Sequence, residues 1–410
     1  MTIPAATDRI AALDLVRGAA VLGILAINIA SFAGSPTAPL SPRLSGPASP
    51  ADELAFVIGL VLFEGKMRGL FTLLFGASLL LLVDRRNATG EDGARWQARR
   101  LGWLLVIGYC HQLFLWSGDI LMVYALIAPL ALAMRHLSGK AMLTAALVLF
   151  TLWHGSLTLI GWSSFAAAEA AHAGTATPQQ LADLARSAAA SSGQLTRDIA
   201  VLQLPYGEML AERLVQTLYQ PLLVTLITFG ETLPLMLVGM ALYRSGLFSG
   251  TWLPARIGRM GLAALAIGLP LAMAQAWWAW SRGFPPEAMF FLLVGAAGPQ
   301  HFALTLAWLA LLVWAAPLLA GTWAGQRLTA AGRMALSNYL LTSLVMTGIF
   351  HGWGLGLIGT VGPAEQWLFV ILGWTIMLGW SAPWLARFRQ GPGEWLWRSL
   401  TERWLLPLKQ

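Results

Sequence analysis

Long apolar segments recur along the whole chain, and they constrain its fold more than any other feature of the sequence. Residues 13–33 form the first, and several later segments also reach the roughly 20 residues that a helix needs to cross a bilayer. The composition agrees, because 57% of the residues are hydrophobic and 11% are charged, whereas soluble domains carry about 25% charged residues. Lipid offers backbone groups no hydrogen-bond partners, so a spanning segment must satisfy its own. We therefore predict an all-α fold, a polytopic bundle of transmembrane helices.

The apolar pattern predicts about ten membrane spans. Their predicted bounds are 13–33, 52–83, 101–117, 119–134, 141–165, 217–243, 258–281, 287–317, 334–351 and 364–386. The second is too long for one simple span, so we expect a break near Gly65 between a short segment, 52–64, and a main helix, 68–83. The pattern divides the chain into four parts. An N-terminal membrane half (1–165) is followed by a helical insertion (166–216), a C-terminal membrane half (217–386) and an interfacial amphipathic helix (387–410).

Two segments outside the predicted spans carry helix signals of their own. In the insertion, Thr177 can cap a helix whose first residue is Pro178, and Gln180 completes a capping box. This helix could cover a site on its side of the membrane or act as a spacer. Near the C-terminus, aromatic and leucine side chains are spaced to lie along the membrane interface, so we expect a surface helix without a catalytic role. These side chains are Trp395, Trp397, Leu400 and Trp404.

The basic residues are unevenly distributed between the two sides of the predicted bundle. Nineteen of the 26 Lys and Arg residues fall on the side that contains the N-terminus. The positive-inside rule then places both termini in the cytoplasm, in the inner membrane of a bacterium. The same distribution argues against nucleic-acid binding despite a net charge of +7, because the basic residues lie in short loops. The single cysteine, Cys110, allows no intrachain disulfide, and we expect no metal site.

Charged side chains within the predicted spans are the first candidates for function, because burying them in lipid is costly. Glu64, Lys66 and Arg68 lie near the expected break. Glu64 and Arg68 are four residues apart and could pair on one helix face, while Lys66 would seek Asp119 or a ligand phosphate. We expect these groups to gather beside one polar chamber in the outer half of the membrane. The alternative is that they form ion pairs that only lock helices together.

Further polar residues are expected at the same depth. His111 and Gln112 lie in the outer half of the third span, and Asp119 follows across a turn, where it could tune His111 as a general base. Asn28 lies on the same face of the first span as Arg17 and could hold a ligand or bridge helices. Near the outer end of its span, His351 could line the same chamber.

Other polar residues in or next to the predicted spans have fewer neighbouring residues that indicate a function. Glu231 is a further carboxylate inside a predicted span. Arg333 and Asn338 lie at the cytoplasmic start of another span, where a guanidinium suits phosphate oxygens or serves only as a positive anchor. The sequence contains no motif of the familiar soluble enzymes, such as a phosphate-binding loop or a nucleophile elbow.

Five ordered motifs span nearly the whole chain and resemble the YeiB-like family of bacterial membrane proteins. They are LDLVRGAAVLGILAINI at 13–29, KMRGLFTLLFG at 66–76, HQLFLWSGDILMVYAL at 111–126, GRMALSNYLLTSL at 332–344 and GPGEWLWRSLT at 391–401. That family is distantly similar to transmembrane acyltransferases such as heparan-α-glucosaminide N-acetyltransferase. The resemblance implies transfer of an acyl group from cytoplasmic acyl-CoA to an acceptor on the far side, with an intramembrane His as base. Those acyltransferases place this His near the end of the first helix, where this chain has Asn28 and no His, so His111 takes the role on chemical grounds.

The acyltransferase hypothesis gives each candidate residue a role. The catalytic set is His111, Asp119 and Asn28; the acceptor-binding set is Glu64, Lys66, Arg68, Gln112 and His351; and the set for acetyl-CoA or another acyl-CoA is Arg17, Arg333 and Asn338. The acceptor would be an amine or hydroxyl compound, either a sugar or lipid-linked. Besides these molecules we expect membrane lipids as partners, and a homodimer is compatible with the sequence. The alternatives are a transporter of a small anionic or amphipathic compound and a non-catalytic scaffold.

Overall fold

Helices make up nearly all of the regular structure in the described part of the chain, and that part contains no β-strand. The computed structural model describes residues 6–44, 46–216 and 219–409. The long helices of the bundle are α1 (Ala6–Ala33), α2 (Pro50–Leu62), α3 (Lys66–Ala88), α4 (Gly93–Phe114), α5 (Leu121–Ala133), α6 (Gly139–His172), α9 (Gln220–Arg244), α10 (Pro254–Ser281), α12 (Gly298–Leu319), α14 (Ala335–Phe350) and α15 (Pro363–Leu385). The other α-helices are α7 (Pro178–Leu202), α8 (Tyr206–Gln216), α11 (Pro286–Phe290), α13 (Trp323–Arg333) and α16 (Pro392–Glu402). The predicted all-α fold is confirmed.

Seven stretches of the described chain are long and apolar enough to cross a membrane. They are Ala12–Ala33, Pro50–Ala88, Gly139–His172, Gln220–Arg244, Pro254–Ser281, Gly298–Leu319 and Pro363–Leu385. Two shorter apolar helical stretches, Leu121–His136 and Ala335–Phe350, correspond to other predicted spans, while a third, Pro286–Ala296, falls in the same predicted span as Gly298–Leu319. The predicted span 287–317 is divided among α11, a π-helical segment and α12. Residues 217–218, at the start of another predicted span, lie outside the described residues. These helices fit a multi-pass membrane protein.

The break near Gly65 is confirmed. Helix α2 ends at Leu62 and α3 begins at Lys66, with Gly65 at a φ of 74° between them. This backbone conformation favours glycine. The ring of His301 fills the space that a Cβ on Gly65 would occupy.

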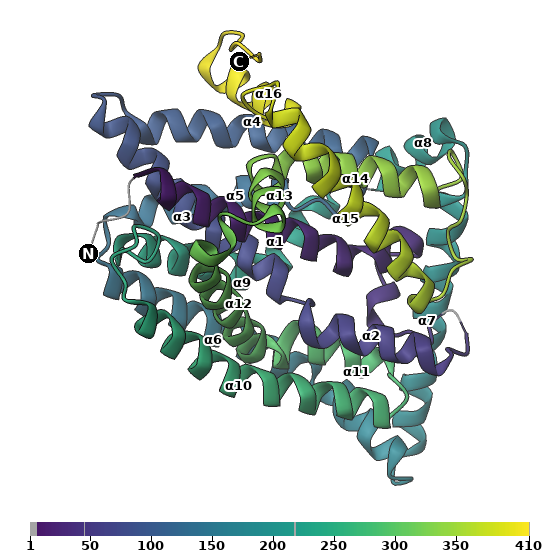
Figure 1. The fold of residues 1–410 in the computed structure, drawn as a ribbon. Helices are drawn as coiled ribbons and strands as arrows, with labels where there is room; N and C mark the ends of the chain where they lie inside the picture. The colour runs from purple at the N-terminus through teal and green to yellow at the C-terminus, as the bar shows by residue number, and fades with distance from the viewer. Residues whose placement is uncertain (1–5, 45, 217–218, 410) are drawn as a thin grey trace.

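Helix α1 runs through the middle of the molecule, and most of the other long helices are arranged around it (Figure 1). It contacts α13, α15, α3, α14 and α12. We call the side where α1 begins the terminal side. The opposite side, where α7 and α8 lie, is the insertion side (Figure 1).

Two glycines from the recognised motifs allow α1 and α13 to cross in close contact. A Cβ on Gly332 would lie 1.7 Å from the carbonyl oxygen of Asp14, and one on Gly18 would lie 2.0 Å from that of Leu328. Both obstacles are backbone atoms, so a side chain could enter only if the helices moved apart. The spacing between α1 and α13 therefore depends on these two glycines.

Replacing Gly332 by alanine is expected to destabilise the protein by about 1–3 kcal/mol or more, because the added methyl group overpacks this crossing. Gly258 in α10 is the matched control, since a Cβ there meets no atom within 4 Å. Gly258→Ala should instead stabilise by roughly 0.5–1 kcal/mol, the usual gain in a helix interior. The melting temperatures of the purified variants in detergent measure both effects. Equal melting temperatures for the two variants would contradict the close crossing.

The insertion is helical, as its capping box predicts. Thr177 accepts a hydrogen bond from the backbone N of Gln180, and the Gln180 side chain accepts one from the backbone N of Thr177. At the end of α4, the hydroxyl of Tyr206 donates to the carbonyl oxygen of Phe114 at 3.0 Å. The backbone N of Gly352, just after α14, donates to Leu202 at 2.9 Å. The insertion thus contacts the ends of α4 and α14.

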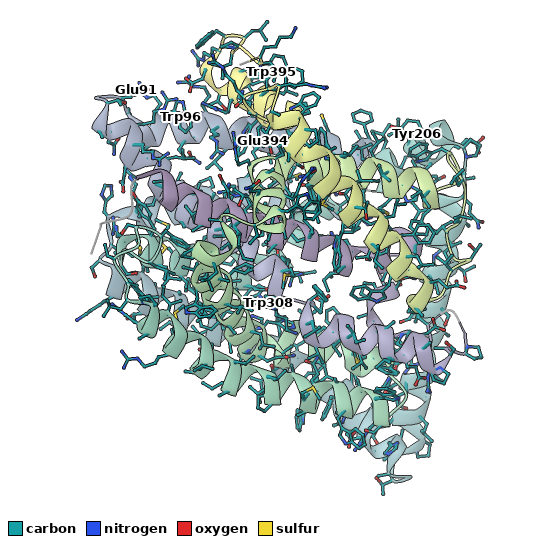
Figure 2. All side chains as sticks on the ribbon, viewed as in Figure 1. Glu91, Trp96, Tyr206, Trp308, Glu394 and Trp395 are labelled. Atoms are coloured by element: carbon teal, nitrogen blue, oxygen red, sulfur yellow. The ribbon has the colours of Figure 1, made fainter. Side chains whose placement is uncertain are left out.

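The C-terminal helix α16 packs against α4 and α14. Trp397 is buried, and its indole N donates to the carbonyl oxygen of Arg100 at 2.8 Å. The expectation that Trp397 lies along the lipid interface is therefore wrong, although Trp404 is exposed. Glu394 on the same helix reaches the start of α14 (Figure 2). The reason is that α16 folds back onto the bundle and buries one of its faces.

Candidate functional site

His111 is buried between a carboxylate and a hydroxyl group. It lies in the last turn of α4, and its Nδ1 is 2.8 Å from Oδ1 of Asp119 in the turn before α5. Its Nε2 is 2.8 Å from Oγ of Ser343 in the middle of α14. His111, Asp119 and Ser343 are only 3%, 5% and 1% exposed. The predicted proximity of His111 and Asp119 is confirmed, and Ser343 joins them.

The surrounding hydrogen bonds determine which ring nitrogen of His111 carries the proton. Oδ2 of Asp119 accepts from the backbone N of Met122 at 2.7 Å, which fixes the carboxylate. Oδ1 then accepts from Nδ1–H of His111, because a carboxylate offers only acceptors. Nε2 is left as an acceptor and faces the hydroxyl of Ser343. An imidazole held in this tautomer can take a proton as a general base.

A small cavity of about 10 Å³ lies beside this group, between α1 and α14. Its volume is close to that of one water-sized probe, so it has room for one small group. Asn28 on α1 and Ser343 on α14 both contribute to its wall. The lining residues are Val21, Ile24, Leu25, Asn28, Phe32, Tyr339, Thr342 and Ser343.

A larger cavity of about 290 Å³ opens near the start of α1, on the terminal side. Tyr339, Val21 and Ile24 line both cavities, so its inner end adjoins the small one. That inner end is largely apolar. The charged residues that line the larger cavity are Asp14, Arg17, Arg85, Arg100, Arg333 and Glu394. We call it the arginine cavity.

The arginines of this cavity greatly outnumber their partners. Arg17 donates to Asp14 at 2.7 Å and to Ser78 at 3.3 Å. In the part of the chain that the structure describes, Arg85, Arg100 and Arg333 form no ion pair. Guanidinium groups present several fixed donors and suit phosphate oxygens. The cavity can therefore bind a polyanion.

The carboxyl group of Glu394 already has hydrogen-bond partners within the protein. Its Oε1 accepts from the backbone N of Leu336 at 2.7 Å and of Ser337 at 3.2 Å, and its Oε2 accepts from the Ser337 hydroxyl. The carboxyl group thus caps the N-terminus of α14. Burial raises the pKa of Glu394, while these hydrogen bonds lower it less. Glu394 therefore acts as the cap of α14, and the arginines supply most of the charge in the cavity.

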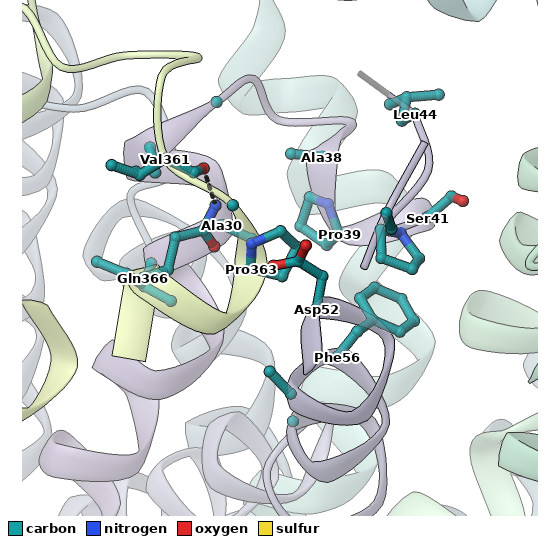
Figure 3. A pocket seen from close by; sticks show the side chains of 18 of the residues that line it. Ala30, Ala38, Pro39, Ser41, Leu44, Asp52, Phe56, Val361, Pro363 and Gln366 are labelled. Atoms are coloured by element: carbon teal, nitrogen blue, oxygen red, sulfur yellow. Dashed lines mark hydrogen bonds between the residues drawn. The ribbon is translucent and has the colours of Figure 1, made fainter. Parts of the chain in front are cut away.

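A third cavity, of about 230 Å³, lies on the insertion side. Asp52 and Gln366 supply polar groups to its wall (Figure 3), and Glu64 also lines it. It contacts Ala26, Ala30 and other residues on the face of α1 opposite to Asn28. Glu64 therefore does not share a cavity with His111, and the expectation of a single polar chamber is wrong. The reason is that α1 separates the two groups.

The expected partners of Lys66 and Arg68 are also wrong. Arg68 donates to Oε2 of Glu231 on α9 at 2.8 Å and does not pair with Glu64. Lys66 is fully buried and donates from Nζ to the carbonyl oxygen of Leu60 at 2.8 Å, so it does not pair with Asp119. The break at Gly65 interrupts the helix between Glu64 and Arg68, so their four-residue spacing no longer places them on one helix face.

Three other predicted residues lie away from these cavities. Gln112 is buried beside His111 in α4 but lines none of the three. His351 is also buried, at the end of α14. Asn338 donates to Ala331 and Ser381, and its oxygen accepts from the indole N of Trp380, so its amide holds helices together. We therefore assign Asn338 to packing.

The structure brings to the site residues that the sequence pattern does not predict. Ser343 lies inside the motif at 332–344, four residues after Tyr339, and this spacing puts both on one face of α14. The ring of Tyr339 contacts that of His111, with centroids 4.9 Å apart. Arg100 lies just before a predicted span, where its sequence context indicates only the orientation of the chain. The spacing in α14 is the one signal that could have identified Ser343.

Known proteins match the chain along nearly its whole length. The family described as "Protein of unknown function (DUF418)" matches residues 242–403. The chain is 31% identical to "Uncharacterized protein YeiB" of Escherichia coli strain K12, covering 97% of each chain. It is 30% identical to "Uncharacterized protein YxaH" of Bacillus subtilis strain 168, covering 96% of this chain and 94% of the relative. No solved structure matches significantly. On these matches, the chain belongs to the YeiB-like family.

Proposed function

We propose that this protein is a membrane acyltransferase. It would take an acyl group, with acetyl the first candidate, from acyl-CoA and transfer it to an amine or hydroxyl group of a sugar or lipid-linked acceptor. The single observation that carries the proposal is that the arginine cavity ends beside the buried His111–Asp119 pair.

The donor would bind from the terminal side, which we assign to the cytoplasm of a bacterium, with the protein in the inner membrane. Acyl-CoA is polyanionic, and Arg85, Arg100 and Arg333 form no ion pair among the described residues. Their guanidinium groups would bind its phosphates at the mouth of the cavity. The apolar inner end, with Ile120 and Tyr339, would receive the acyl-bearing arm.

His111 would act as the base. An attacking hydroxyl or amine must lose a proton during acyl transfer, and Nε2 is the unprotonated nitrogen in the tautomer that Asp119 favours. The thioester oxygen gains negative charge in the transition state, so a nearby donor stabilises it. Asn28 contributes an amide group to the wall of the small cavity.

Binding of the donor can be tested without knowing the acceptor. Acetyl-CoA and CoA should raise the melting temperature of the purified protein, because a ligand that binds only the folded state stabilises it. Arg100→Gln and Arg333→Gln should each weaken binding about tenfold, which corresponds to about 1.4 kcal/mol. Arg256→Gln is the matched control: Arg256 stacks on Trp252, 3.7 Å from the ring centroid, and does not line the cavity.

Titration of the melting temperature with each ligand measures these affinities. The proposal fails if neither acetyl-CoA nor CoA raises the melting temperature at millimolar concentration. It also fails if Arg256→Gln weakens binding as much as Arg333→Gln does, because the charge would then act without a defined site. If a small anion raises the melting temperature and the protein also carries it unchanged across the membrane of vesicles, the result would favour a transporter instead.

A further inference from the structure

We propose that Ser343 is a nucleophile that carries the acyl group as an ester between donor and acceptor. This step rests on the proposed acyltransferase function and deepens it, since a direct transfer needs only His111 as base. The observation behind it is the hydrogen-bonded series from Ser343 through His111 to Asp119.

The geometry is that of a nucleophile activated by a base and an orienting carboxylate. Oγ of Ser343 is 2.8 Å from Nε2 of His111, and Nδ1 is 2.8 Å from Asp119. Both distances lie in the range for productive hydrogen bonds. Such a triad is recognised by its geometry and not by residue order or fold.

The hydroxyl of Ser343 has a second acceptor within reach, the carbonyl oxygen of Tyr339 at 3.2 Å. A serine in a helix often bonds to this position, one turn earlier. The contact with His111 is shorter, and the imidazole nitrogen is a stronger base than an amide oxygen. The hydroxyl proton is therefore directed at Nε2, which leaves Oγ ready to attack.

The thioester carbonyl group of the donor can occupy the small cavity. Ser343 and Asn28 line it together, on facing helices. Among the described residues, the Asn28 amide makes no hydrogen bond to another side chain or to the backbone, so its N–H groups remain available. An oxygen that becomes negative beside Ser343 can accept a hydrogen bond from that amide.

The reaction then runs in two balanced halves. Oγ of Ser343 attacks the thioester carbon while Nε2 of His111 takes the hydroxyl proton; the C–S bond breaks, and the CoA sulfur receives that proton. The acyl group is now an ester on Ser343, and CoA leaves. The acceptor hydroxyl or amine attacks the ester and gives its proton to Nε2. The C–O bond to Oγ breaks, and Oγ recovers a proton from His111.

The size of the small cavity favours such a covalent intermediate. It has room for one small group beside Ser343, so donor and acceptor cannot occupy it together. Phe32 lines the small cavity and stacks on Trp116, with ring centroids 4.2 Å apart. Phe32 lies near the end of α1, so this stack bounds the small cavity toward the insertion side. An acyl-serine lets CoA leave before the acceptor arrives.

Labelled acetyl-CoA without acceptor tests the proposal. The wild-type protein should gain one acetyl group, released by hydroxylamine and located on Ser343 by peptide mass analysis. It should also exchange labelled CoA into acetyl-CoA, which only a mechanism with a covalent intermediate allows. Ser343→Ala should lose the label and reduce exchange by at least about 10³-fold while still binding acetyl-CoA. Ser343→Cys should keep a hydroxylamine-sensitive label as a thioester.

Thr347→Val is the matched control, since it removes the next buried hydroxyl along α14, which bonds only to backbone carbonyl oxygens. It should retain label and exchange. A wild-type protein that binds acetyl-CoA but carries no label and shows no exchange overturns the acyl-serine and leaves direct transfer intact. Label that persists in Ser343→Ala overturns it as well. Failure of acetyl-CoA to bind at all refutes the proposed function first, a different result from either of these.

Discussion

Replacing His111 by alanine is expected to slow acyl transfer by about 10²–10⁴-fold, the usual contribution of a positioned general base. Donor binding should change little, because the arginine cavity, and not His111, would bind the CoA phosphates. His111 is held at 2.8 Å by both Asp119 and Ser343, so its removal deprives the attacking group of its proton acceptor. The rate is measured as labelled acetyl groups that move from acetyl-CoA into extracted membrane sugars and lipids.

A second buried histidine provides the control for this substitution. His154 on α6 is buried like His111, but its Nδ1 contacts only the carbonyl oxygens of Val294 and Gly295, and it lines none of the described cavities. His154→Gln keeps a donor for those oxygens and should preserve transfer. If His111→Ala retains full transfer activity, His111 is not the base, and the catalytic part of the account is wrong.

Breaking the ion pair between Arg68 and Glu231 is expected to cause a large loss of stability. Arg68→Met should destabilise the protein by about 2–3 kcal/mol, because it leaves the carboxylate of Glu231 buried without a partner. The Glu231 side chain is 13% exposed and that of Arg68 41%, so the expected loss is smaller than the roughly 3–5 kcal/mol of a fully buried pair.

A double-mutant cycle tests whether Arg68 pairs with Glu231 or with Glu64, the partner that the sequence suggests. Arg68→Met combined with Glu231→Gln should recover part of the stability lost in each single variant. Glu64→Gln is the matched control: it should change the melting temperature little, because Glu64 does not pair with Arg68. A cycle that couples Arg68 to Glu64 and not to Glu231 would contradict the structure at this point.

Local features of this chain could be predicted from sequence, and long-range partners could not. The break at Gly65 and the capping box at Thr177 depend on neighbouring residues, so their sequence signals are complete. His111 and Asp119 are eight residues apart across one turn, which makes their contact predictable. Ser343 is 232 residues from His111, and no local pattern specifies that pairing.

The ion-pair partners that the sequence predicts wrongly have the same cause. Arg68 has a carboxylate four residues earlier, at Glu64, and the sequence favours that local partner. The actual partner, Glu231, is 163 residues away, and only the packing of α3 against α9 brings it close. The predicted single chamber failed for a related reason: two polar groups at one depth can still lie on opposite faces of a helix, here α1.

Acyl-CoA that binds in the arginine cavity should lie with its acyl group beside His111 and Ser343. A structure of the protein in lipid nanodiscs with acetyl-CoA would reveal this position. Phosphate density is expected at Arg100 and Arg333, and a thioester carbon is expected within about 3–3.5 Å of Ser343 Oγ, the distance of a near-attack geometry. Acetyl-CoA bound elsewhere, or bound in the cavity with its thioester turned away from His111, would contradict this binding mode.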